Sequence, residues 1–157
     1  MKISIIGLGY VGWSLSVLLS QKHDVISYDI DEKKINNINN FIYPFIDDEI
    51  NNLLPEKKLN LLATTCKETA YEDSDFVIIC TPTNYDDALE SFDTSIVEKV
   101  IADSIKYNNT TNIVIKSTIP FGFTDKMKRT YNKDEIFFSP EFLREGKELY
   151  DNLYPSR

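Results

Sequence analysis

Short apolar runs alternate along this chain with longer amphipathic stretches. Six runs are predicted to be β-strands because they are short, apolar and bounded by turn residues: KISIIG, DVISYD, LNLLAT, FVIICT, TNIVIKST and EIFFSP. Four stretches between them have apolar residues near helical spacing and are predicted to be α-helices: YVGWSLSVLLSQ, DEKKINNIN, DTSIVEKVIADSIKY and FGFTDKMKRTY. We expect FIYPFIDDEINNLLPEKK to be a connection that holds a short helix.

The alternation of strands and helices is typical of parallel βαβ units. The apolar runs are too continuous for a sheet with one exposed face, so helices are expected to cover both faces. We therefore predict an α/β, Rossmann-like, doubly wound and mostly parallel six-stranded sheet with helices on both faces. The length of 157 residues suits one domain, which we place at residues 1–157.

Composition excludes several classes of protein. The formal net charge of −8 argues against a nucleic-acid-binding surface, which needs clustered Lys and Arg. No apolar run reaches the roughly 18 residues that indicate a membrane span, and no signal peptide is apparent, so we expect no membrane partner and a cytoplasmic location. Cys66 and Cys80 form neither a disulfide framework nor a zinc pattern, and we expect no metal site.

The segment GLGYVG, residues 7–12, has the G-x-G-x-x-G spacing of a dinucleotide-binding turn between a predicted strand and a predicted helix. Gly7 would permit the tight turn, Gly9 would let a pyrophosphate approach the backbone, and Gly12 would let the helix pack close to the strand. The N-terminus of the helix then offers free amides and positive partial charge to the phosphates.

Asp29 ends the second predicted strand, where an acidic residue of such proteins binds the adenosine ribose. Its carboxylate would repel a 2′-phosphate, which favours NAD over NADP as the cofactor. Lys34 argues in the other direction, because a nearby cation tolerates that phosphate. The alternative is a glycine turn that serves backbone geometry alone, with Asp29 as a helix cap.

Polar residues also follow three later strands, at the edge of the sheet where ligands bind in this architecture. They are Thr81, Pro82 and Thr83; then Ser117 and Thr118; then Glu141, Arg144 and Glu145. A carboxylate beside Thr118 could act as a general base. Glu141 and Glu145 would share a face if their segment were helical. The alternatives are ordinary Thr-Pro and Ser-Pro turn chemistry, and a solvated helix face with Lys147 and Glu148.

The motifs GLGYVG, TPTN, STIP and FSPEFLREGKELYDNLYPSR together resemble the N-terminal half of UDP-glucose 6-dehydrogenases, in the UDP-glucose/GDP-mannose dehydrogenase family. The resemblance covers the whole chain in order. Its last motif is the most specific: GDP-mannose dehydrogenases match it less closely, and the UDP-N-acetylmannosamine enzymes read differently there. The resemblance implies oxidation of UDP-glucose to UDP-glucuronate with two NAD, through a thiohemiacetal and a thioester on a cysteine.

The resemblance also implies roles for individual residues. Of the cofactor-binding positions, the resemblance supplies Val11, Asp29, Lys34, Thr83, Thr118 and Glu145. Together with the glycine turn and the strand ends, the predicted set is Gly7, Gly9, Tyr10, Val11, Gly12, Asp29, Lys34, Thr81, Pro82, Thr83, Ser117, Thr118 and Glu145. The substrate-binding positions are Glu141, Phe142, Leu143, Arg144 and Glu145. The catalytic positions are Thr118, which matches a water-binding residue, Glu141, which matches a candidate base for thioester hydrolysis, and Glu145. Trp13 departs from the family, which has a smaller apolar residue there, and we expect it to change packing more than chemistry.

The family's nucleophilic cysteine lies in a later GGxCxPKD-type segment, beyond a central helix that supplies oxyanion donors and most of the dimer interface. We therefore expect residues 1–157 to be a truncated NAD-binding domain, inactive alone, from a homodimer whose UDP-sugar domain follows. Cys80 is not expected to replace the nucleophile, because its IICTP context supplies neither base nor cation. The alternatives are another sugar-nucleotide dehydrogenase, of the GDP-mannose or UDP-N-acetylmannosamine type, and a non-catalytic NAD-binding module.

Overall fold

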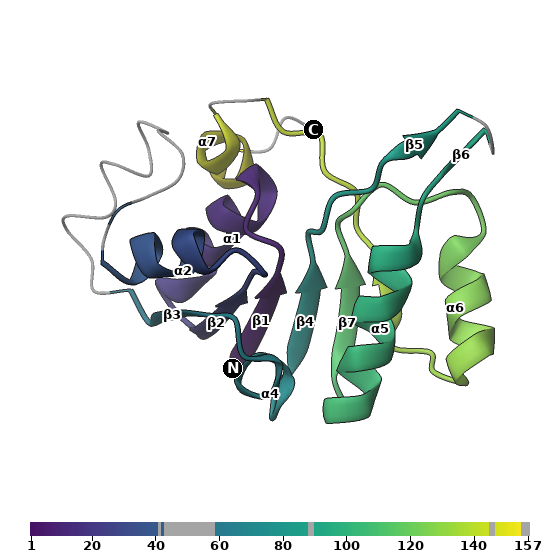
Figure 1. The fold of residues 1–157 in the computed structure, drawn as a ribbon, viewed down its shortest axis with the longest axis horizontal. Helices are drawn as coiled ribbons and strands as arrows, with labels where there is room; N and C mark the ends of the chain where they lie inside the picture. The colour runs from purple at the N-terminus through teal and green to yellow at the C-terminus, as the bar shows by residue number, and fades with distance from the viewer. Residues whose placement is uncertain (41, 43–58, 88–89, 145–146, 155–157) are drawn as a thin grey trace.

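A six-stranded sheet forms the centre of the molecule (Figure 1). The structure, a computed structural model, describes residues 1–40, 42, 59–87, 90–144 and 147–154. The strand order is β3-β2-β1-β4-β7-β8, and each described pairing in this sheet is parallel. The strands are β1 (Lys2–Ile6), β2 (Asp24–Tyr28), β3 (Leu61–Thr64), β4 (Phe76–Ile79), β7 (Asn112–Ile115) and β8 (Ile136–Phe138). The prediction of a doubly wound, six-stranded sheet is confirmed.

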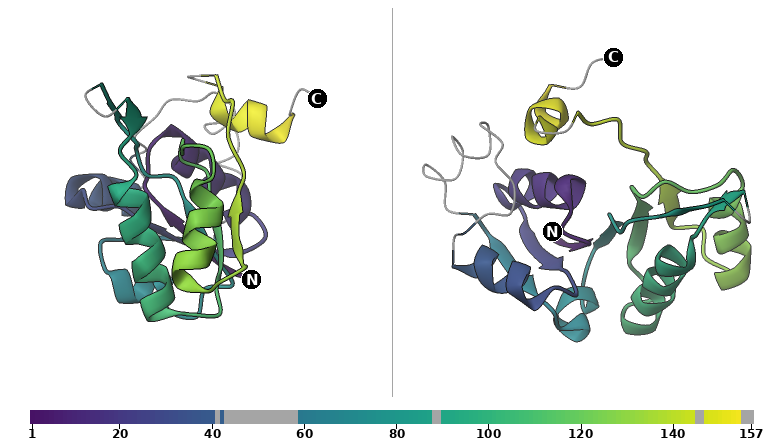
Figure 2. Two further views of the ribbon diagram at one scale, coloured as in Figure 1. Left: turned by 90° about the vertical axis from the view of Figure 1, so that its right-hand side faces the viewer. Right: turned by 45° about the horizontal axis from the view of Figure 1, so that its top comes forward.

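Helices cover both faces of this sheet, as predicted. One face carries α1 (Tyr10–Ser20), α2 (Glu32–Asn39) and α7 (Glu148–Leu153); the other carries α4 (Lys67–Tyr71), α5 (Ser95–Tyr107) and α6 (Phe123–Tyr131). The alternation of side chains along β1 explains the two cores. Ile3 and Ile5 pack under α1, whereas Ile6 packs with α4, α5 and α6. Two views show α7 lying over α1 (Figures 1 and 2).

The order of the strands reverses between β1 and β4, which pair directly through Ile6 and Ile79. From β1 the chain builds outward to β2 and β3, and from β4 it builds the other way to β7 and β8. In open parallel sheets, ligands bind in the crevice beyond the carboxyl ends of the strands at such a switch point. The glycine turn after β1 and the Thr-Pro segment after β4 therefore flank the expected crevice.

Three short elements were not predicted: α4, α7 and an antiparallel hairpin of β5 (Tyr85–Asp86) and β6 (Ser91–Phe92). Each is too short to show a clear periodicity. The short helix predicted within residues 41–58 falls almost wholly outside the described residues, and so does Glu145. Within the part of the chain that the structure describes, no helix is long and apolar enough to cross a membrane.

Candidate functional site

The three glycines of the turn after β1 have different surroundings. Gly7 has φ of 96°, and a Cβ atom built on it would lie 2.7 Å from the carbonyl oxygen of Cys80. A Cβ atom on Gly12 would lie 1.9 Å from the carbonyl oxygen of Gly7. A Cβ atom on Gly9 would meet nothing within 4 Å. The turn thus requires glycine at two positions for packing, and at the third it leaves open space beside the backbone where a phosphate fits.

The N-terminus of α1 faces that open space. Gly9 is the N-cap residue, and no acidic side chain stands in the first turn of the helix. The first-turn amides and the positive end of the helix dipole are therefore available to an anion.

Asp29 stands just beyond β2 and is 9% exposed. Its carboxylate accepts hydrogen bonds from the backbone N of Leu8 at 2.8 Å and of Asp31 at 3.0 Å, and pairs with Lys34 Nζ at 3.0 Å. Burial raises the pKa of Asp29, but the combined effect of these hydrogen bonds and the Lys34 cation is larger and opposite. The pKa of Asp29 is therefore below its ordinary value. Asp29 is thus an ionised hydrogen-bond acceptor beside the glycine turn.

The helix that follows is capped by a different aspartate. Asp31 Oδ1 accepts from the backbone N of Lys33 at 2.9 Å and of Lys34 at 3.2 Å, at the start of α2. The alternative interpretation of Asp29 as the helix cap is therefore wrong. Lys34 is already engaged by Asp29, so its charge is partly compensated.

A first cavity of about 280 Å³ lies next to Asp29. Its walls are mostly apolar, and its lining includes an ion pair of 2.5 Å between Lys67 and Asp103. Tyr71 of α4 is buried, and burial raises the pKa of its hydroxyl. The lining residues are Ile6, Gly7, Tyr28, Asp29, Ile30, Lys67, Tyr71, Thr81, Pro82, Ile96, Lys99, Val100 and Asp103. This chamber suits a flat, largely apolar group attached to a polyol that reaches Asp29.

A second cavity of about 300 Å³ shares Thr81 and Pro82 with the first. Its lining residues are Val11, Cys80, Thr81, Pro82, Thr83, Lys116, Ser117, Thr118 and Glu141. Ser117 is buried and donates to the carbonyl oxygen of Thr81 at 2.6 Å, whereas Thr118 is exposed. The hydroxyl oxygen of Thr81 is buried and has no hydrogen-bond partner among the described residues. A buried hydroxyl left unsatisfied is costly, so a polar ligand group at this wall would stabilise it.

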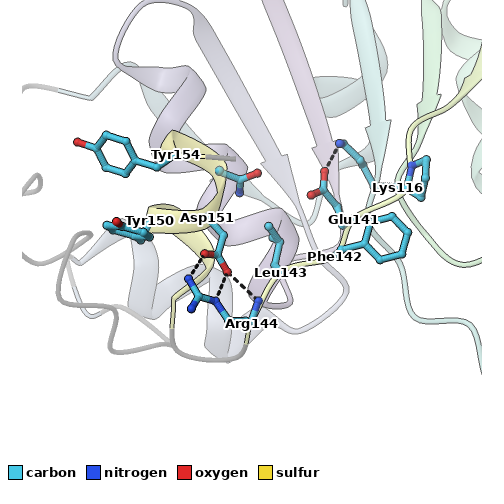
Figure 3. Close-up of a pocket in the computed structure, with 10 residues that line it drawn as sticks. Lys116, Glu141, Phe142, Leu143, Arg144, Tyr150, Asp151 and Tyr154 are labelled. Carbon is cyan, nitrogen blue, oxygen red and sulfur yellow. Dashed lines mark hydrogen bonds and ion pairs between the residues drawn. The ribbon is translucent and has the colours of Figure 1, made fainter. Parts of the chain in front are cut away.

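A third cavity of about 790 Å³ opens between the segment after β8 and α7 (Figure 3). Its lining residues are Lys116, Pro140, Glu141, Phe142, Leu143, Arg144, Tyr150, Asp151, Asn152 and Tyr154. Arg144 donates two hydrogen bonds to the carboxylate of Asp151, from Nε at 3.1 Å and from Nη2 at 2.5 Å. Hydrogen bonding from Arg144 lowers the pKa of Asp151 to about 2. This pair fixes the segment after β8 against α7.

Glu141 and Lys116 form an ion pair in the wall that the second and third cavities share. Residues 141–144 are not helical, because the helix begins only at Glu148. The prediction that Glu141 and Glu145 share a face required a helix in this segment, and residues 141–144 do not form one. Glu145 itself lies outside the described residues. Lys116 stands in the KSTIP motif, yet the sequence analysis passed over it in favour of the two hydroxyls that follow.

Cys80 lines the second cavity as a neutral thiol. Burial raises its pKa to about 12, against the opposing effect of the Lys116 cation and with a further increase from Glu141. The sequence-based premise that no cation stands near Cys80 is wrong, because Lys116 is close enough to act on it. Burial outweighs that cation, and a neutral thiol is a poor nucleophile.

Helix α1 also contacts α7. Trp13 and Leu149 are both fully buried in one apolar cluster, and Asn152 Nδ2 donates to Ser14 Oγ at 2.8 Å. Trp13 therefore fills the space between α1 and α7.

The three cavities bring together most of the predicted site residues. Those lining at least one cavity are Gly7, Val11, Asp29, Thr81, Pro82, Thr83, Ser117, Thr118, Glu141, Phe142, Leu143 and Arg144. Gly9, Tyr10, Gly12 and Lys34 line none of the three. The sequence analysis missed Lys67, Tyr71, Lys99, Asp103, Lys116, Tyr150, Asp151, Asn152 and Tyr154. Several of these belong to α4 and α7, which were not predicted.

UDP-glucose 6-dehydrogenases of two bacteria match the chain over its whole length. A UDP-glucose 6-dehydrogenase from Streptococcus pneumoniae is 54% identical over 157 residues, and one from Campylobacter jejuni is 46% identical over 159 residues. Each match covers 100% of this chain and 40% of the relative, so the chain spans about two fifths of their length.

Solved structures agree in fold. A GDP-mannose dehydrogenase from Pseudomonas aeruginosa superimposes with a TM-score of 0.83 at 29% identity, over 99% of this chain and 39% of that protein. A UDP-glucose dehydrogenase from Pyrobaculum islandicum gives 0.78 at 26% identity, over 98% and 39%. The model of the NAD-binding domain of the UDP-glucose/GDP-mannose dehydrogenase family matches residues 1–157. The chain therefore belongs to the UDP-glucose/GDP-mannose dehydrogenase family, as its NAD-binding domain.

Proposed function

We propose that the chain supplies the NAD site of an enzyme that oxidises UDP-glucose to UDP-glucuronate with two NAD. One observation carries the proposal: three cavities follow one another along the carboxyl edge of the sheet and share walls at Thr81 and Pro82 and at Lys116 and Glu141. Such a row has the layout that an adenosine, a nicotinamide and a sugar nucleotide need in order to bring a hydride donor to its acceptor.

NAD fits the first two cavities. The open backbone at Gly9 and the N-terminus of α1 suit its pyrophosphate. Asp29 accepts hydrogen bonds from the ribose hydroxyls, and the adenine binds in the apolar first cavity. The nicotinamide lies in the second cavity, where the unsatisfied hydroxyl of Thr81 and the exposed hydroxyl of Thr118 can bind its amide or a water molecule. NAD supplies the hydride acceptor when it is bound there.

The sugar nucleotide is assigned to the third cavity, beside Glu141 and Arg144. Arg144 pairs with Asp151 through Nε and Nη2, and its side chain is still 62% exposed, so it adds to this wall a planar cation of the kind that suits phosphate oxygens. Glu141 is the proposed base, with Thr118 holding water across the shared wall. Glu145 keeps its predicted cofactor and catalytic roles as part of the same proposal.

The rest of the machinery is assigned to a longer protein. Cys80 is a neutral thiol, so the nucleophilic cysteine, the oxyanion donors and the dimer contacts are proposed to come from sequence beyond this domain. The proposed partner in that case is a second copy of the full-length protein.

The test is an assay of the complete protein with NAD and each of three sugar nucleotides: UDP-glucose, GDP-mannose and UDP-N-acetylmannosamine. We expect NADH to form at two equivalents per UDP-glucose consumed, and much more slowly with the other two. Faster turnover of GDP-mannose would favour the second candidate, which the fold similarity to the Pseudomonas enzyme supports. No turnover with any of the three would reduce the function to NAD binding.

A further inference from the structure

We infer that Lys116 is a positioning residue that fixes the carboxylate of Glu141 at the wall between the second and third cavities. The inference rests on the proposed function, which gives Glu141 its task at that wall. Lys116 acts through Glu141 and not by touching the cofactor or the sugar.

Both partners are tied to the sheet. The backbone N of Lys116 donates to the carbonyl oxygen of Ile79 at 2.9 Å, which anchors the end of β7 on β4. The backbone N of Ser139 donates to the carbonyl oxygen of Ile115 at 2.9 Å, which anchors the start of the Glu141 segment on β7. Lys116 Nζ then bridges Ser139 Oγ, at 3.0 Å, and Glu141 Oε1. The ammonium group is therefore held at a defined place between two strand ends.

A contribution to stability does not explain why the Lys116–Glu141 ion pair lies at this place. The side chains of Lys116 and Glu141 are only 15% and 13% exposed. Burying two charges costs desolvation energy that their attraction offsets at best approximately, and apolar residues of similar volume often serve stability equally well. A largely buried ion pair in the wall common to two ligand-sized cavities instead indicates a role in what the cavities bind.

The two carboxylate oxygens of Glu141 have different surroundings. Lys116 holds Oε1, and Oε2 accepts no hydrogen bond from any of the described residues. Figure 3 shows that second oxygen turned away from Lys116. Oε2 is thus free to accept a hydrogen bond from a ligand hydroxyl or a water molecule, in an orientation that Lys116 fixes. A carboxylate without this anchor would rotate, and loss of such alignment is expensive for catalysis.

Lys116 does not serve Cys80 instead. The Lys116 cation acts on the thiol, but burial dominates and the thiol stays neutral. Glu141 is therefore the group that Lys116 controls.

The first test uses the complete protein, with Lys116→Met, Lys116→Arg, Glu141→Gln and the double variant Lys116→Met with Glu141→Gln. We expect Lys116→Met to lower kcat on the order of 10- to 100-fold while KM for NAD changes by less than about twofold. Lys116→Arg should restore most of kcat, and the double variant should be no slower than Glu141→Gln. Losses that multiply in the double variant would overturn the inference, because Lys116 would then act independently of Glu141.

A matched control removes a lysine from an exposed ion pair. Lys126 and Glu98 lie 3.1 Å apart with side chains 60% and 37% exposed, so Lys126→Met should leave kcat unchanged. An equal loss in Lys126→Met would mean that any lost lysine has this effect, and would contradict the assignment.

A second test needs no enzyme activity, so it separates this inference from the proposed function. Urea unfolding of the 157-residue chain is measured for Lys116→Met, for Glu141→Gln and for the double variant that combines them. The matching set of single and double variants is measured for Lys126 and Glu98. We expect clear coupling between Lys116 and Glu141, and much weaker coupling between Lys126 and Glu98. Absence of coupling at Lys116 and Glu141 would overturn the inference. Absence of turnover in the unmodified protein, with coupling present, would overturn the proposed function alone.

Discussion

The carbonyl oxygen of Gly7 lies so close to Gly12 that a Cβ atom on Gly12 would come within 1.9 Å of it. This contact joins the start of α1 to the turn after β1 and sets the helix end over the crevice. Gly9, in the same motif, has open space on the corresponding side. One motif therefore combines a glycine that the packing of the turn requires with a glycine that has open space beside its backbone.

Gly12→Ala should lower the free energy of unfolding by about 1–3 kcal/mol or more, because backbone must move to admit the methyl group. Gly9→Ser should change it by no more than about 0.5 kcal/mol, since serine is a good N-cap residue. It should nevertheless weaken NAD binding at least about tenfold, or about 1.4 kcal/mol, because the side chain occupies the pyrophosphate position. Urea unfolding and calorimetric NAD titration measure the two effects. A Gly9→Ser chain that binds NAD normally would contradict the assignment of the open space.

The two cysteines should differ sharply in reactivity. Cys66 is exposed, and hydrogen bonds from the side chain and backbone of Thr69 lower its pKa, which increases its thiolate fraction near neutral pH. Cys80, with its pKa raised to about 12, stays protonated until far more alkaline pH. A disulfide reagent at pH 8 should therefore modify Cys66 quickly and Cys80 much more slowly in the folded chain.

Cys66→Ser is the control for this experiment and should remove the fast phase alone. Two thiols reacting at similar rates in the folded chain would contradict the neutral state assigned to Cys80.

Trp13 is the single tryptophan of the chain and is fully buried beside Leu149 of α7. Leu149→Ala should loosen α7 and admit water to the indole, so the emission maximum of Trp13 should move to longer wavelength. Leu62→Ala, at a side chain 46% exposed on β3, is the matched control and should leave the emission unchanged. An unchanged spectrum in Leu149→Ala would show that α7 does not cover Trp13.

The sheet, the glycine turn and Asp29 were accessible from sequence because each rests on local signals: apolar runs, glycine spacing and the acid that ends β2. The Lys116–Glu141 pair was not, because its members are 25 positions apart and meet only when β8 pairs with β7. The Arg144–Asp151 pair depends in the same way on where α7 packs. The elements that were not predicted, namely α4, α7 and the hairpin of β5 and β6, contain too few residues to reveal a period.

Calorimetric titration of the 157-residue chain with NAD and with NADP tests the central claim most directly. The ionised Asp29 beside the glycine turn predicts that NAD binds at least about tenfold more tightly than NADP. Asp29→Asn, which removes the charge and frees Lys34, should abolish most of that preference. Asp31→Ala, which removes only the cap of α2, should keep it at a cost of about 1 kcal/mol in stability. Equal affinity of the unmodified chain for NAD and NADP would contradict the role of Asp29, and no binding of either would contradict the account of the site.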